Sequence, residues 1–147
     1  METSIVLLVS SVKSGVDGRR WAGIHDAMGK KILLVEDDQD WRLMATAALN
    51  DAGYEVLGVS GAAEALLPTS EAGFNLIILD LDLGGENGLM LLQHLKRNHP
   101  AAPIILHTGI EHDDLAIQNM LQHGAHQYVR KGPVSGLLAA VADALGC

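Results

Sequence analysis

Short, continuous apolar runs recur along the chain and constrain its fold more than any other feature of the sequence. Three are strong, at residues 32–35, 76–79 and 104–106, and two are weaker, at residues 54–59 and 128–129. Runs without polar alternation are typical of strands that are covered on both faces. The stretches between the runs place apolar residues at helical spacing, as in Leu137, Leu138, Val141 and Leu145. The pattern predicts five strand-helix units, hence an α/β protein with a parallel sheet and helices on both faces.

Local signals agree with this division of the chain. Glycines that follow the expected first, second and fourth helices would adopt the left-handed backbone that often ends a helix. Short polar residues that precede the fourth and fifth helices are expected to cap them. The predicted C-terminal caps are Gly53, Gly73 and Gly124, and the predicted N-caps are Asp113 or Asp114 and Ser135.

Composition and charge exclude several classes of function. The 147 residues correspond to one ordinary domain, and 48% of them are hydrophobic, which is enough for a core. Lys and Arg number 10 against 18 Asp and Glu, a net charge of −8 that disfavours binding to nucleic acid or to an anionic membrane. The single cysteine, Cys147, excludes an internal disulfide and a cysteine metal cluster.

The first 29 residues differ from the rest of the chain. Their apolar run, residues 5–9, is too short to span a bilayer, and Glu2 precedes it where a secretory signal would be basic. Beyond that run, this segment lacks clear strand or helix periodicity. We therefore expect a loosely ordered extension over residues 1–29, a domain over residues 30–147, and a cytoplasmic location.

Polar side chains follow four of the five predicted strands. Each taken alone could be a helix cap or a turn residue. Because parallel strands bring their carboxyl ends to one edge of a sheet, the four groups together predict a shared site. They are Glu36, Asp37 and Asp38 after the first strand, Asp80 after the third, His107 and Thr108 at the end of the fourth, and Arg130 and Lys131 after the fifth.

Four segments of the chain resemble the signature segments of the response-regulator receiver domain. They are KILLVEDDQDWR, LIILDLDLGGENG, IILHTG and YVRKGP, and the resemblance covers residues 30–147. It implies a doubly wound (βα)5 fold with the flavodoxin-like strand order 2-1-3-4-5. The site residues that it implies are Asp80 as phosphoacceptor, Glu36 and Asp37 as the acidic pair, Thr108 as the switch hydroxyl, Lys131 as the site lysine and Tyr128 as the switch aromatic.

The resemblance also implies a metal-dependent phosphorylation. Three carboxylates at one site repel one another unless a cation is present, and Mg²⁺ prefers such oxygen ligands. Asp37 and Asp80 would bind Mg²⁺ directly, Glu36 would act through a bound water, and the backbone carbonyl of Asp82 would add a ligand. The Lys131 ammonium would contact a phosphoryl oxygen.

The partners follow from the same resemblance. The donor would be a sensor histidine kinase or a histidine phosphotransfer protein of a two-component or phosphorelay system. The chain would be no enzyme beyond its own phosphorylation and dephosphorylation. Only one helix is expected after Lys131, so the signal would leave through a surface changed by Thr108 and Tyr128. A downstream protein is the expected target, with a homodimer as an alternative, and neither nucleic acid nor membrane is expected to bind directly.

Three positions depart from the family pattern. Leu83-Gly84 stands where the family usually has Met-Pro, which should loosen that loop. Gly132 separates Lys131 from Pro133, so we expect a trans bond after Lys131 and place any cis bond at Gly132-Pro133. His107 precedes Thr108 where a small or apolar residue is commoner, and we interpret it as a half-buried structural histidine that points away from the site.

Two other classes of function remain open from the sequence. Asp80 and Asp82 form the DxD pattern of haloacid-dehalogenase-like phosphatases, although the acidic pair precedes this pattern here and follows it in that family. A protein-binding module that is never phosphorylated is the second alternative. The histidines at positions 94, 99, 112, 123 and 126 fit no common zinc spacing, and we interpret them as solvated helix residues.

Overall fold

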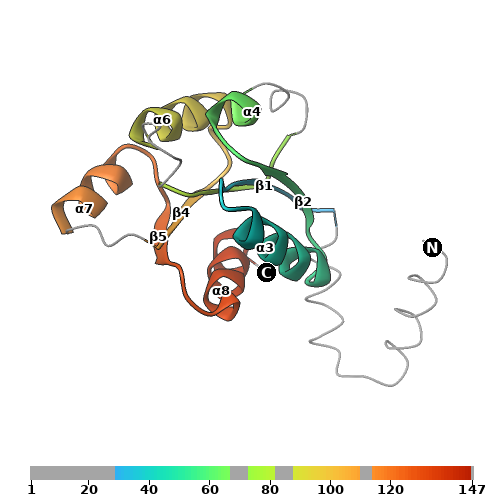
Figure 1. Cartoon of the computed structure of the whole chain (residues 1–147). Coiled ribbons are helices and arrows are strands. Elements are labelled where there is room, and N and C mark those ends of the chain that lie inside the picture. Colours follow the sequence, from blue (N-terminus) through green and yellow to red (C-terminus); the bar gives the residue numbers. More distant parts are fainter. Residues whose placement is uncertain (1–28, 67–72, 82–87, 110–113, 147) are drawn as a thin grey trace, which may run out of the picture.

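A parallel sheet of five strands forms the centre of the molecule. The computed structural model describes residues 29–66, 73–81, 88–109 and 114–146. The strand order is β2-β1-β3-β4-β5 (Figure 1), which confirms the order implied by the family resemblance. The strands are β1 (Lys31–Val35), β2 (Glu55–Val59), β3 (Leu76–Leu79), β4 (Ile104–Thr108) and β5 (Gln127–Arg130).

Helices cover both faces of this sheet, as Figure 1 shows. Helices α3 (Gln39–Asp51) and α8 (Val134–Leu145) lie on one face. Helices α4 (Ala62–Leu66) and α6 (Gly88–Asn98) lie on the other, with α7 (Asp114–Gln122) beside β5. Each face therefore has its own hydrophobic core.

The central strands contribute side chains to both hydrophobic cores, and this explains why their sequences are unbroken apolar runs. In β1, Leu33 and Val35 pack toward α4 and α6, while Ile32 and Leu34 pack toward α3 and α8. All four side chains are buried. Successive side chains of a strand point to opposite faces, so a strand with helices on both sides has no solvent-facing position for a polar residue.

The register aligns the carboxyl ends of the strands. Val35 of β1 pairs with Leu79 of β3, and Leu79 pairs with Leu106 of β4. The backbone N–H of Asp80 donates to the carbonyl of Val35 at 2.9 Å, and that of Lys131 donates to the carbonyl of Thr108 at 2.9 Å. The polar residues that follow β1, β3, β4 and β5 are thereby fixed at one edge of the sheet.

Most local predictions agree with the structure, and one cap is wrong. Gly53, Gly73 and Gly124 have φ values of 103°, 62° and 113°, the left-handed backbone expected of them. Helix α8 begins at Val134 with Pro133 as its N-cap, so Ser135 lies inside the first turn and does not cap the helix.

The peptide bonds near Gly132 and the lengths of the helices both bear on expectations from the sequence. Every peptide bond in the described residues is trans, including the bonds on both sides of Gly132. Among the described helices, none has the length and apolar character that a membrane crossing needs.

Candidate functional site

Three acidic side chains meet at the carboxyl edge of the sheet. Carboxylate oxygens of Glu36, Asp37 and Asp80 lie within 4.8 Å of one another. Glu36 and Asp80 are only 2% and 3% exposed, whereas Asp37 is exposed to solvent. The cluster therefore gathers carboxylate oxygens from two buried side chains and one that is exposed to solvent.

The turn between β1 and α3 holds the acidic pair in place. The N–H of Glu36 donates to the carbonyl of Val59 at 2.9 Å, and the Arg42 guanidinium donates to the carbonyl of Glu36 at 2.7 Å. Asp38 caps α3, since its carboxylate accepts from the N–H of Trp41 at 3.1 Å. Asp38 therefore serves as the N-cap of α3, while Glu36 and Asp37 belong to the acidic cluster.

Lys131 supplies the positive charge of the site. Its ammonium nitrogen lies 2.6 Å from Oε1 of Glu36 and 3.4 Å from Oδ2 of Asp80. Burial alone would lower the pKa of Lys131, but the carboxylates of Glu36 and Asp80 outweigh it and raise this pKa. The lysine is therefore charged, and it lies closer to Glu36 than to Asp80.

Glu36 is the carboxyl group whose proton affinity the site changes most clearly. Burial, followed by the neighbouring Asp80 side chain, raises the pKa of Glu36 to about 7, although Lys131 opposes this change. One ammonium does not neutralise three neighbouring carboxylates, two of which are buried. The arrangement favours either a proton on Glu36 or a cation among the carboxylates.

Thr108 and Tyr128 lie on the neighbouring strands β4 and β5. Thr108 is the last residue of β4 and is fully buried. Tyr128 pairs with Leu106 in the register of β4 and β5, and its partly buried side chain packs against the core on the α6 face. Thr108 therefore lies at the carboxyl end of β4, and Tyr128 lies two positions earlier in the register of β5.

Two histidines are more buried than the sequence suggested. His107 is 4% exposed, and burial lowers its pKa to about 4, so the ring is neutral near pH 7. The expectation that it points away from the site is wrong, because its ring contacts that of Trp41, which in turn contacts the Lys131 ammonium. His99 was expected to be a solvated helix residue, but it follows α6 and is 8% exposed, with its ring edge-on to Phe74 at 5.7 Å. The contact with the Phe74 ring explains why His99 is buried and not solvated as expected.

Several predicted features lie outside the described residues. They are the Asp82 carbonyl, the Leu83-Gly84 turn, the extension over residues 1–28, and the residues before Asp114, including the alternative cap Asp113.

The structure also adds two residues that the sequence analysis did not single out. Arg42 binds the carbonyl of Glu36, and the Trp41 ring centre lies 5.2 Å from the Lys131 ammonium. The position of Arg42 in the first turn of α3, soon after the acidic pair, is a signal that could have indicated its contact.

A doubly wound α/β fold with an acidic cluster and a lysine at its carboxyl edge defines the class of this protein. The family model described as the response regulator receiver domain matches residues 32–142. The chain therefore belongs to the response regulator receiver domain family.

Comparison with curated relatives agrees with this assignment. The chain is 34% identical over 120 residues to the response regulator protein FleR of Pseudomonas aeruginosa. The match covers 81% of this chain and 25% of FleR, so the chain spans about a quarter of that relative's length.

Solved structures show the same fold. A CheY-like response regulator receiver domain protein from Methanospirillum hungatei is 29% identical with a TM-score of 0.73, over 80% of this chain and 94% of that one. A response regulator from Burkholderia pseudomallei, solved with a phosphorylated aspartic acid, a calcium ion and citrate, is 30% identical with a TM-score of 0.71. That match covers 80% of this chain and 69% of the other.

Proposed function

We propose that this chain is the phosphoacceptor of a two-component or phosphorelay system and that Asp80 receives the phosphoryl group. The observation that carries the proposal is the meeting of Asp80 with Glu36, Asp37 and Lys131 at one edge of the sheet. A cluster of this kind combines a nucleophilic carboxylate with groups that can neutralise charge on a transferred phosphoryl group.

The proposed reaction is a direct transfer between two side chains. A carboxylate oxygen of Asp80 forms a bond to phosphorus while the bond from phosphorus to an imidazole nitrogen of the donor histidine breaks. The donor imidazole keeps the electron pair of the broken bond. Hydrolysis of the acyl phosphate by water later restores the Asp80 carboxylate and releases inorganic phosphate.

The residues of the cluster fit a hard divalent cation. Their carboxylate oxygens lie within 4.8 Å of one another, and hard cations such as Mg²⁺ and Ca²⁺ prefer oxygen ligands. Asp37 and Asp80 would hold Mg²⁺ directly, and Glu36 would assist through water. The bound cation supplies positive charge to the phosphoryl oxygens. The similar Burkholderia response regulator, solved with a calcium ion and a phosphorylated aspartic acid, supports this assignment.

Lys131 and Thr108 would act on the product. The Lys131 ammonium lies 3.4 Å from Oδ2 of Asp80, so it can pair with a phosphoryl oxygen after a small movement away from Glu36. A threonine hydroxyl can donate a hydrogen bond to another phosphoryl oxygen. The proposed switch is the inward turn of Thr108, followed by Tyr128.

The proposed output surface consists of α7, β5 and α8. Helix α7 buries none of its described side chains, and Leu115 on it is 79% exposed. Strand β5 is an edge strand of the sheet. We propose that a protein partner binds here, a downstream target or a second copy of this chain, and that the donor is a sensor histidine kinase or a histidine phosphotransfer protein.

Phosphorylation from a small donor tests the function. We expect purified protein incubated with acetyl phosphate and Mg²⁺ to gain one phosphoryl group, and we expect the gain to disappear when EDTA removes the cation. A label that forms equally well in EDTA would contradict the metal-dependent mechanism. Repeated turnover of a phosphate monoester would instead favour the phosphatase alternative.

A further inference from the structure

Helix α3 presents to the site an aromatic side chain that the proposed chemistry does not use. The Lys131 ammonium lies over the Trp41 ring, 5.2 Å from its centre. On the sheet side, the buried His107 ring meets the Trp41 ring edge-on, with centres 5.7 Å apart and planes at 81°. The backbone N–H of Trp41 donates to the carboxylate of the N-cap Asp38 at 3.1 Å. The indole is therefore held from its backbone and from the sheet.

We propose that Trp41 is a positioning residue that holds the Lys131 ammonium beside Asp80. The inference rests on the function proposed above. A cation within about 6 Å of an indole face is attracted by the negative charge density of the ring. Glu36 and Asp80 bind the ammonium through their oxygens, and the indole provides a third contact that carries no competing formal charge.

The segment next to Lys131 and the length of the lysine side chain explain why a contact with the Trp41 ring would help to position the ammonium. Gly132 follows the lysine, and a Cβ placed there would meet nothing within 4 Å, so this residue packs no side chain of its own against the site. A lysine side chain also has several freely rotating bonds, which costs entropy when the ammonium must occupy one place. A fixed aromatic ring reduces the number of positions that the ammonium can adopt.

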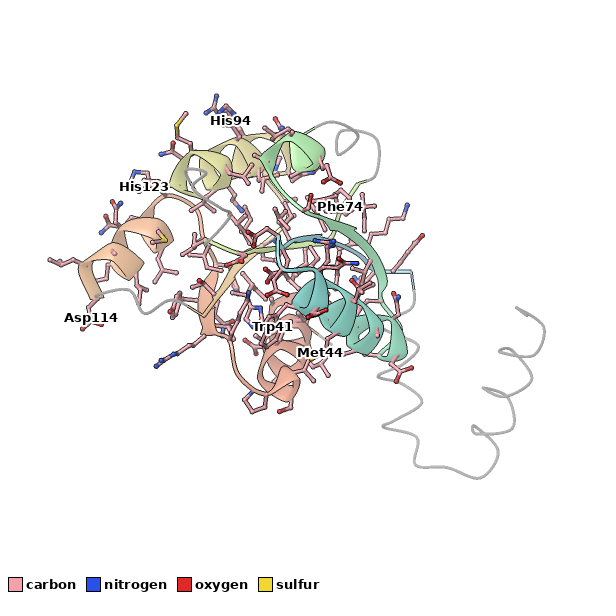
Figure 2. The ribbon with its side chains drawn as sticks, in the orientation of Figure 1. Trp41, Met44, Phe74, His94, Asp114 and His123 are labelled. Atoms are coloured by element: carbon pink, nitrogen blue, oxygen red, sulfur yellow. The ribbon has the colours of Figure 1, made fainter. Side chains whose placement is uncertain are left out.

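A groove beside the indole provides a matched control for a test. Trp41 lines a groove of about 360 Å³ together with Met44, Pro133 and Val134, and the indole is only partly buried. Figure 2 shows Trp41 and Met44 on the α8 side of α3. Met44 is 44% exposed and lines the same groove, so Met44→Leu is a matched control that leaves the ring above Lys131 in place.

The first measurement needs no phosphorylation. In the metal-free protein, NMR should show the Hε protons of Lys131 shifted upfield by the indole ring current. This shift should be retained in Trp41→Phe and Met44→Leu, and it should be lost in Trp41→Leu. Unshifted Hε protons in the unmodified protein would overturn the proposal, and this result is independent of whether Asp80 is ever phosphorylated.

The second measurement is the initial rate of Asp80 phosphorylation by acetyl phosphate with Mg²⁺. Trp41→Leu should be about fivefold slower, which corresponds to ~1 kcal/mol. Trp41→Phe and Met44→Leu should stay within about twofold of the unmodified protein. Equal rates for Trp41→Leu and Met44→Leu would overturn the positioning role, while failure of the unmodified protein to become labelled would count against the proposed function instead.

Discussion

Replacing Glu36 by Gln should change how the stability of the metal-free protein depends on pH. The pKa of Glu36 is 4.5 in an unperturbed chain and about 7 in the folded protein, because burial and the Asp80 side chain disfavour its charge. The folded state therefore binds this proton more tightly than the unfolded state. The resulting stabilisation is complete below pH 4.5 and is lost as the pH rises through about 7.

The magnitude follows from these two pKa values. From about pH 6 to about pH 8, proton linkage at Glu36 removes about 1 kcal/mol from the free energy of unfolding. Burial of His107 lowers its pKa to about 4, so His107 acts in the opposite direction and stabilises the fold as the pH rises. Burial also lowers the pKa of His99, with the same sign. Both histidines remain in Glu36→Gln, so the difference between the two proteins isolates Glu36.

The assay is urea unfolding of both proteins in EDTA at the two pH values. The free energy of unfolding of Glu36→Gln, relative to the unmodified protein, should increase by about 1 kcal/mol from the lower to the higher pH, or roughly 4 °C in Tm. The attraction between Lys131 and ionised Glu36 is already contained in the pKa of Glu36, and the raised pKa of Lys131 keeps the ammonium charged at both pH values. A difference that stays the same at both pH values would refute the reasoning.

Three further predictions concern single side chains of the site and its surroundings. Asp37→Ala should weaken Mg²⁺ binding, measured by calorimetry, and slow phosphorylation far more than Asp38→Ala. The Asp38→Ala variant should instead lose about 1 kcal/mol of stability, because the N-cap of α3 is removed. Two variants that behave alike would show that the acidic pair is assigned to the wrong residues. Asp82→Ala should change the lifetime of the phosphoryl group, and an unaltered decay rate would mean that this side chain points elsewhere. Tyr128→Ala should preserve labelling of Asp80 while reducing the difference in amide exchange along β5 between the phosphorylated and the unphosphorylated protein. Loss of labelling would assign Tyr128 a structural role.

The fold could be predicted from the sequence because a strand that is buried on both faces has an unbroken run of apolar residues. Strands β1 and β3 are covered by helices on both sides, and their unbroken apolar runs marked them to within a residue. Strand β5 was weaker in the sequence, because it is an edge strand whose residues are only partly buried. The N-cap of α8 was misplaced, since Pro133 restricts the backbone before the helix while Ser135 has the commoner capping side chain.

The acidic cluster could be anticipated for a similar reason. Parallel strands in register must bring Glu36 and Asp80 to one edge, whatever the loops do. The partner that Lys131 prefers could not be anticipated, because it depends on distances of 2.6 Å and 3.4 Å to two competing carboxylates. The contact of Trp41 with Lys131 depends on how α3 is rotated relative to the segment after β5, which no sequence spacing specifies.

The central claim is that Asp80 accepts a phosphoryl group. The most direct test is to incubate the unmodified protein and Asp80→Asn with acetyl phosphate and Mg²⁺ and to locate the modified residue by mass spectrometry. Asn is close to Asp in size but lacks the nucleophilic carboxylate, so circular dichroism should show the same fold for both proteins. We expect one phosphoryl group on the peptide that contains Asp80 and none on Asp80→Asn. Equal labelling of Asp80→Asn, or a label on another residue of the unmodified protein, would contradict the account.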